Sequence, residues 1–279
     1  MISIVGLGSA ASKIAEKFKQ TKNYNVYVMN GNVERNSKYK FKLKTYDTPE
    51  EYEANIPNVK KFLGTSDEHI QIFIVGSSLS SAYALGILEQ IKHRKIDVFY
   101  IQPDGELMTG VPKLLDRAVF SILQEYARSG LLASFTAMSN VAIEKTIGDI
   151  PIKHYYDRIN DSIFSTVHYI NYFNHAEPEI GMTSKPLDIN RIRTYGILNT
   201  KNLEEKWLYQ LDMGRDLCYY LCINNKRLEN EGGLHKKIVD MLKEKPRNAF
   251  RKISYAIYET EHNDFGLCVA HTNAVQEYI

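Results

Sequence analysis

Short apolar runs alternate with amphipathic helical patterns through the first 140 residues of the chain. The apolar runs predict strands at 2–5, 24–30, 71–75, 96–103 and 131–140. Apolar residues at helical spacing predict helices at 9–20, 83–92 and 113–130. Strands joined by helices run parallel, so segment 70–140 predicts two successive β-α-β units. A further strand-loop-helix precedes them.

An edge strand is predicted at 38–44, where Tyr39, Phe41 and Leu43 alternate with lysines. Lysines on the outward face hinder pairing with another chain, and we favour this interpretation over a nucleic-acid surface. Pro49 then opens a short helix, since proline fits the first helical turn.

After residue 150 the pattern changes to one long helix and a mixed region. Helical spacing predicts a helix over 152–175, and a loop rich in helix-breaking residues follows it. The region beyond predicts strands at 195–198, 218–224, 252–259 and 267–270 and a helix at 234–244, with 203–211 open between strand and loop. Such a mixture favours a second α/β domain with an antiparallel sheet.

The predicted fold class is therefore α/β, with an N-terminal Rossmann-like parallel sheet domain, a long core helix and a smaller C-terminal mixed α/β domain. We expect residues 1–150 to form a nucleotide-binding-like domain. Residues 151–180 would form the core helix and its connecting loop, and residues 181–279 the C-terminal α/β domain.

Composition narrows the class of protein without naming a partner. The 279 residues are 44% hydrophobic and 24% charged, with a net charge of +2, so no attraction to nucleic acid or an anionic membrane is expected. No apolar run approaches the ~20 residues of a membrane span, and no signal peptide is visible. Cys218, Cys222 and Cys268 are expected to be buried free thiols. These features favour a cytoplasmic setting.

Small residues crowd two strand-to-helix turns, at 6–12 and at 76–82. Backbone N–H groups face outward at such turns, which is where phosphates bind. Gly6, Gly8 and Ala11 also match the spacing of a dinucleotide fingerprint. That fingerprint requires an acid at the end of the next strand, and this chain has Met29 and Asn30 there.

Taken in order, the elements resemble the tubulin/FtsZ superfamily. The resemblance rests on a strand followed by GLGSAASK, strands ending in IVGSSLSSA, in IQP and at Asn140, a long central helix, and a loop containing LDINR. In that family the first loop reads GxGGxGxN, and the second, the signature loop, reads GGGTGTG or GGGTGSG. The resemblance covers about residues 1–200 in order, and it implies GTP or GDP as the possible ligand.

The resemblance also assigns residues. Positions implied for nucleotide binding are Gly6, Gly8, Ser9, Ser12, Gly76, Ser77, Ser78, Ser80, Ser81, Thr109, Gly110, Asn140 and Asn160. Asp188 matches the first acid of the family's catalytic loop, which completes the site of the neighbouring subunit. No metal ligand set is expected in the chain.

Several positions depart from the family pattern. Serines and alanines replace most loop glycines, Leu79 stands for the threonine of the signature loop, and Arg191 stands for the second catalytic acid. Leucine has no hydroxyl to offer a phosphate, and arginine cannot act as a base. We expect Leu79 to pack inward, as one apolar anchor among serines.

These observations predict a tubulin/FtsZ-like protein with a degenerate GTP site. It would act as a scaffold, filament subunit or partner-binding protein with weak or no hydrolysis, and its partner would be itself, head to tail, or another protein. Two alternatives stay open. One is an active filament-forming GTPase of the same fold, and the other is a Rossmann-like enzyme binding a nicotinamide or another small ligand.

A charge pattern bears on assembly. The loop 177–193 carries Lys185, Arg191 and Arg193, whereas the segment 47–53 carries four acids. If these segments of two copies meet, opposite charge would hold them together, and salt would weaken the contact.

Overall fold

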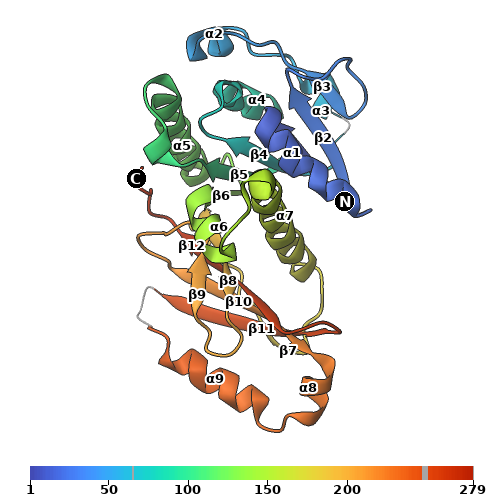
Figure 1. The fold of residues 1–279 in the computed structure, drawn as a ribbon, viewed down its shortest axis with the longest axis vertical. Helices are drawn as coiled ribbons and strands as arrows, with labels where there is room; N and C mark the ends of the chain where they lie inside the picture. The colour runs from blue at the N-terminus through green and yellow to red at the C-terminus, as the bar shows by residue number, and fades with distance from the viewer. Residues whose placement is uncertain (65, 247–250, 279) are drawn as a thin grey trace.

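One continuous sheet of twelve strands forms the centre of the molecule in the computed structural model, which describes residues 1–64, 66–246 and 251–278 (Figure 1). Its order is β3-β2-β1-β4-β5-β6-β8-β12-β10-β11-β7, with β9 paired to β8. The strands are β1 (Ile2–Leu7), β2 (Tyr24–Asn30), β3 (Lys40–Lys42), β4 (His69–Val75), β5 (Lys95–Gln102), β6 (Ser134–Ser139), β7 (Ile180–Met182), β8 (Ile192–Leu198), β9 (Glu205–Trp207), β10 (Asp216–Asn224), β11 (Lys252–Thr260) and β12 (Phe265–Thr272).

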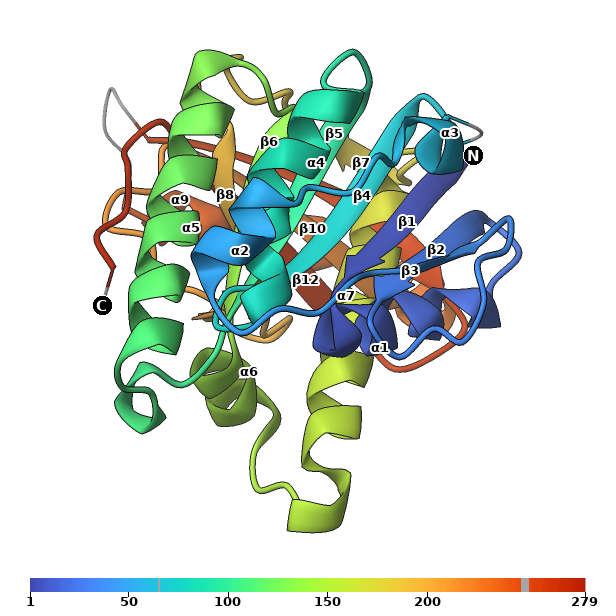
Figure 2. The ribbon, with the colours of Figure 1, turned by 90° about the horizontal axis from the view of Figure 1, so that it is seen from above.

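Helices cover both faces of the parallel part of the sheet (Figure 2). The helices of the described residues are α1 (Ser9–Lys17), α2 (Pro49–Ala54), α3 (Lys60–Leu63), α4 (Ala84–Ile91), α5 (Val111–Ser129), α6 (Asn140–Ile147), α7 (Tyr155–Phe173), α8 (Asn225–Asn230) and α9 (Leu234–Glu244). Of these, α8 and α9 lie beside the second half of the sheet (Figure 1). Because helices lie on both faces, the central strands are apolar along nearly their whole length, as β5 shows.

The first six strands run parallel, which defines two edges of the sheet. We call the edge where β1, β4, β5 and β6 end at Leu7, Val75, Gln102 and Ser139 the carboxyl edge. We call the opposite edge, where β4, β5, β6 and β8 begin at His69, Lys95, Ser134 and Ile192, the amino edge.

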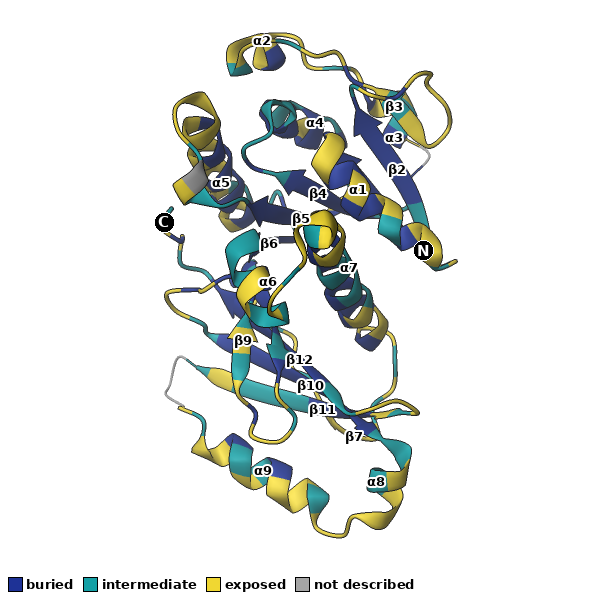
Figure 3. Ribbon diagram, viewed as in Figure 1, coloured by how far each residue is buried: buried dark blue, intermediate teal, exposed yellow. Residues whose placement is uncertain are grey.

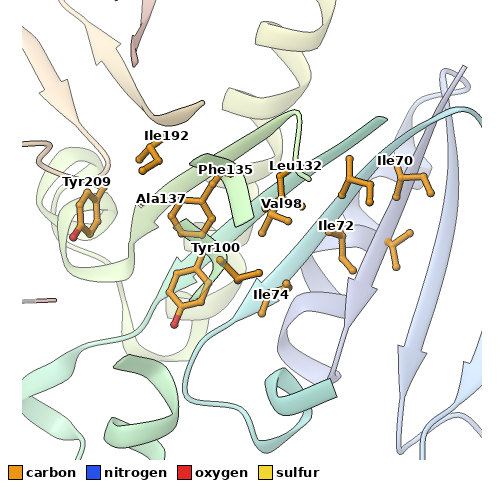
Figure 4. Packing of buried hydrophobic residues seen from close by; sticks show 14 of the residues in the cluster. Ile70, Ile72, Ile74, Val98, Tyr100, Leu132, Phe135, Ala137, Ile192 and Tyr209 are labelled. Carbon is orange, nitrogen blue, oxygen red and sulfur yellow. The ribbon is translucent and has the colours of Figure 1, made fainter. Parts of the chain in front are cut away.

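The two halves of the sheet join between β6 and β8. Ile192 lies beside Phe135 and Thr194 beside Ala137 in a parallel ladder. Figure 4 shows Phe135, Ala137 and Ile192 within one apolar cluster, and all three are fully buried. The second half of the sheet is therefore continuous with the first.

The core helix α7 packs against both halves. Phe164 meets Phe18 of the N-terminal half with ring centroids 4.9 Å apart. At the other end of α7, Phe173 stacks on Tyr258 at 4.6 Å. Asn171 exchanges two amide hydrogen bonds of 2.8 Å with Gln71 of β4. Burial along α7 follows these contacts, and its outer face is exposed (Figure 3).

The segment after β12 returns to the N-terminal half and ends beside α5 (Figure 1). The backbone N–H of Gln276 donates to Gln124 Oε1 at 2.7 Å, and Gln124 Nε2 donates to the Gln276 carbonyl at 3.1 Å. Tyr278 OH donates to Asp116 at 2.5 Å. This tail therefore ties the last strand to α5.

Most of the predicted elements are present, with specific differences. The helix expected at 152–175 begins as a 3-10 turn at Ile152–His154 and continues as α7. The lysines at 38, 40, 42 and 44 are exposed around edge strand β3, which confirms a solvated edge. The expectation of an antiparallel second sheet is only partly right, because β10 and β11 run parallel.

Candidate functional site

The first glycine turn and the signature loop contact each other at the carboxyl edge. A Cβ atom on Gly8 would lie 2.1 Å from Ser80 Oγ and 3.3 Å from Ser78 Oγ. Gly8 also has φ of +87°, a conformation that glycine adopts readily. A Cβ on Gly6 would lie 2.5 Å from Ser12 Cα. Serine side chains of the signature loop therefore lie directly against the first turn.

The signature loop satisfies much of its hydrogen bonding internally. Ser78 N–H donates to the Val75 carbonyl at 3.2 Å, and Ser81 N–H donates to the Ser78 carbonyl at 2.7 Å. Ser81 Oγ donates to the Gly76 carbonyl at 2.9 Å, and the hydroxyls of Ser78 and Ser80 lie 2.7 Å apart. A phosphate cradle needs N–H groups that face outward. At least two of these N–H groups are already used within the loop, while Ser77 is half-buried beside them.

The first glycine turn is better suited to an anion than the signature loop, because the helix that follows it has no side-chain cap. Ser9 is exposed at the start of α1, and no side chain of the described residues caps this helix. Ser12 instead binds backward, its hydroxyl donating to the Gly6 carbonyl at 3.2 Å. The uncapped first turn of α1 therefore retains N–H groups that could face an anion.

Leu79 is half-buried and packs against the apolar core on the α4 and α5 side of the sheet. The 3-10 turn that it opens (Leu79–Tyr83) is covered by α2, where the rings of Tyr52 and Tyr83 lie 4.7 Å apart. The inward orientation expected for Leu79 is thus present. A capping box between Thr48 and Glu51 fixes the start of α2 beside the signature loop.

A buried carboxyl lies directly behind the signature loop. A Cβ on Gly76 would overlap Asp116 Oδ1 and Tyr100 OH. Tyr100 and Tyr278 both donate to the Asp116 carboxylate. Burial raises the pKa of Asp116, and the two tyrosine hydrogen bonds oppose that rise. Gly76 is required here because this packing leaves no room for a side chain.

Two amide groups at the carboxyl edge lack partners. Gln102 ends β5 beside Ser139 of β6, and Asn140 follows directly as the first residue of α6. The buried Nε2 of Gln102 and the buried Oδ1 of Asn140 have no hydrogen-bond partner among the described residues. A buried donor and acceptor left unpaired at one edge suit a ligand that offers both. Sequence reasoning missed Gln102; its place between a buried strand and Pro103 was the available signal.

The remaining predicted residues divide between the two edges. Thr109 and Gly110 are exposed just before α5, and Asn160 is buried on α7. Asp188 lies apart, because its loop leads into β8 at the amino edge. It is exposed, with Lys185 Nζ at 3.0 Å, and this hydrogen bond is the main cause that lowers the pKa of Asp188. Asp188 therefore cannot act within the same copy of the site.

Among the described residues, no three His, Cys, Asp or Glu side chains are grouped so that they could hold a metal ion. A search of the same residues found no helix with the length and hydropathy needed to cross a membrane.

The three cysteines are buried and free, and burial raises the pKa of Cys218 to about 11.

No model of a known protein family matches the chain, and no curated protein matches it. Solved structures match over nearly the whole chain. CetZ from Methanosaeta thermophila strain DSM 6194 superposes with a TM-score of 0.69 at 12% identity, covering 98% of this chain and 86% of its own. An empty FtsZ dimer from M. jannaschii gives 0.68 at 11%, covering 97% and 88%. TubZ of Bacillus thuringiensis serovar israelensis, in a GTPγS-form protofilament, gives 0.72 at 12%, covering 99% and 87%.

The chain has the tubulin/FtsZ fold. The element order that suggested this resemblance is confirmed, with α7 in the position of the core helix. In this tubulin/FtsZ fold the first turn and the signature loop meet at the carboxyl edge, and the loop with Asp188 lies at the amino edge. Asp188, which the resemblance assigns to the same site, therefore lies at the opposite edge of the sheet from the glycine turns.

Proposed function

We propose that the chain is the subunit of a head-to-tail assembly in which the amino edge of one copy meets the carboxyl edge of the next. The observation that carries this proposal is the exposure of large apolar side chains at both edges. Val111, Leu114, Ile152 and Tyr156 are exposed where α5 and α7 begin, on the carboxyl side. Leu187 and Ile189 are exposed in the loop before β8. Exposed apolar groups at both edges suit a contact in which the two edges of different copies meet.

The similar structures support this arrangement, since TubZ is described in a protofilament and in two-stranded and four-stranded filaments. Two copies joined by different edges form a heterologous contact, which extends into an open row when the rotation between copies does not close a ring. In this chain Figure 2 shows the start of α7 projecting beyond the sheet on the carboxyl side, where a neighbouring copy would meet it.

We further infer that the candidate site binds GTP or GDP weakly and does not hydrolyse it. The first turn of α1 and the amides of Gln102 and Asn140 suit a ligand. In the signature loop, however, the N–H groups of Ser78 and Ser81 are already hydrogen-bonded locally. Arg191 replaces an acid that hydrolysis in this superfamily requires from the neighbouring copy. Phosphate release from GTP should stay at background level across a protein dilution series, whereas release that rises with concentration would establish an active GTPase.

The head-to-tail assembly is tested with two variants, each of which blocks one of the two edges with a charged side chain. Leu114→Glu charges the carboxyl side, where Leu114 is 68% exposed, and Ile189→Glu charges the loop at the amino edge, where Ile189 is 62% exposed. In sedimentation velocity each variant alone should be monomeric. An equimolar mixture should form dimers, because each variant keeps the end that the other lacks.

Ile122→Glu is the matched control, because Ile122 is also exposed (38%) but lies mid-way along α5, away from both edges. This variant should assemble like the unaltered chain. A mixture of the two end variants that remains monomeric would contradict the head-to-tail contact. Dimers formed by either variant alone would do the same, since they would indicate a symmetric contact.

A further inference from the structure

A cavity of about 520 Å³ opens at the amino edge, remote from the glycine turns. The starts of β4, β5, β6 and β8 form its floor, and the end of α7 and the loop before β8 form its walls. Its size falls within the range of small-molecule sites. We call it the amino-edge cavity.

Positive charge dominates the lining of the amino-edge cavity. Its Lys and Arg residues are Lys92, Arg94, Lys95, Lys185, Arg191 and Arg193, and its carboxylates are Asp97 and Asp188. Asp97 already accepts hydrogen bonds from Ser134 Oγ at 2.6 Å and has His69 Nε2 at 2.7 Å. Both carboxylates are therefore engaged within the chain.

Two of the cations make no close ion pair within the described residues, although the Asp188 carboxylate acts on Arg191 from a longer distance. Within the described ranges, no carboxylate oxygen lies within 4.0 Å of the Lys95 or Arg191 charged groups. Arg191 Nε donates to the Asp188 carbonyl at 2.7 Å, which positions the guanidinium beside Gly130 at the cavity. Several cations that line one cavity, with both of its carboxylates engaged, favour the binding of an anion there.

A buried amide adds a second requirement. Asn190 lines the cavity and is 4% exposed. Its Nδ2 donates to Asp216 Oδ2 at 2.6 Å, which fixes the orientation of the amide, because a carboxylate only accepts. Asn190 Oδ1 then remains buried with no partner in the described part of the chain. That oxygen needs a donor, which a simple anion does not supply.

We propose that the amino-edge cavity binds a small multivalent organic anion that carries a hydroxyl group. Lys95 and Arg191 hold its charged groups, and Asn190 Oδ1 accepts its hydroxyl. This site is separate from the glycine turns, but its wall includes Leu187 and Lys185 of the loop that the proposed assembly would also use, so the anion and a neighbouring copy would compete for this edge.

Citrate and tricarballylate test the proposal, because they share three carboxylates and differ by one hydroxyl. In calorimetric titrations at fixed ionic strength, citrate should bind the full chain about tenfold more tightly than tricarballylate. Arg191→Gln and Lys95→Gln should each weaken citrate binding about tenfold, the loss of one charge-assisted hydrogen bond. Arg158→Gln, an equal change at an exposed position near the start of α7, should leave it unchanged.

Equal affinity for the two anions would overturn the role given to Asn190. Equal weakening by Arg158→Gln and Arg191→Gln would overturn the location, since it would show general charge attraction. No heat with either anion at millimolar concentration would overturn the site as a whole.

Discussion

Leu79 shows how one side chain can change the role of a loop. A threonine at this position would place a hydroxyl at the carboxyl edge, whereas leucine packs into the core beneath α2. We expect Leu79→Ala to lower the free energy of unfolding by roughly 1–3 kcal/mol, less than a fully buried leucine because Leu79 is half-buried. Chemical denaturation measures this change.

Leu79→Thr supplies the complementary measurement. Because neighbouring N–H groups are already bonded within the loop, restoring the hydroxyl should not raise the affinity for GTP. Micromolar GTP binding by Leu79→Thr, together with an unchanged stability of Leu79→Ala, would show that the loop still serves a nucleotide.

His271 makes stability depend on pH. It lies opposite Arg193 in the β8–β12 ladder, and Asp97 is also near. Burial, assisted by Arg193, lowers the pKa of His271 to about 3, below its ordinary value of 6.5. As pH falls below about 6.5, His271 therefore becomes protonated in the unfolded chain but stays neutral in the folded chain. Stability should be lost on acidification, by at most about 1.4 kcal/mol per pH unit from this group.

Urea unfolding at pH 7, 6 and 5 checks this expectation. This range avoids the titration of Asp97, whose pKa is held well below its ordinary value by Arg193 and His69 despite burial. His271→Gln should show a shallower decline than the unaltered chain. Parallel declines would assign the pH dependence to other groups.

At the scale of elements, the tail after β12 joins segments that are far apart in the sequence. Gln276 is 3% exposed, and its Oε1 accepts from the Asp212 N–H at 2.7 Å. Gln276→Ala would leave that N–H without its partner, at a cost of about 1–3 kcal/mol in unfolding free energy. Glu277→Ala is the control, since its side chain is exposed and should change stability by less than about 0.5 kcal/mol. Equal effects in urea unfolding would show that the tail contributes through its backbone alone.

Local periodicity was enough to predict most of the strands and helices of the first 140 residues. Runs such as β5 are long, apolar and bounded by turns, so local pattern determines them. Short elements such as α3 (Lys60–Leu63) and β7 (Ile180–Met182) were not predicted, because three or four residues are too few to show a period. The β6–β8 junction also escaped, since pairing between Phe135 and Ile192 depends on tertiary contacts.

The candidate site was predictable only in part, for a related reason. Gly6, Gly8 and Gly76 stand out by spacing, and the resemblance supplied the rest. The unpaired amide of Gln102 could not be predicted, because an absent partner is a property of the folded edge. The same holds for Asn190, whose buried oxygen is defined only once Asp216 has taken its amide nitrogen.

At the scale of the whole molecule, charge should reinforce the apolar contacts of the proposed head-to-tail assembly. Asp47, Glu50, Glu51 and Glu53 are exposed around α2, beside the signature loop, and Lys185 is exposed at the amino edge. Association should weaken steeply as salt rises, because exposed charges are screened beyond about 8–10 Å at physiological ionic strength. Sedimentation from low to high salt measures this effect. Association that is insensitive to salt would show that apolar contacts alone stabilise it.

The single sheet has a mechanical consequence for such an assembly. Its parallel strands run from the amino edge to the carboxyl edge, so tension along a head-to-tail row would pull along the strands. Neighbouring strands would then have to slide past one another, which loads all of their ladder hydrogen bonds at once. The proposed contact between copies rests on side chains and has no strand ladder of this kind, so a stretched row should part between its subunits while each subunit stays folded.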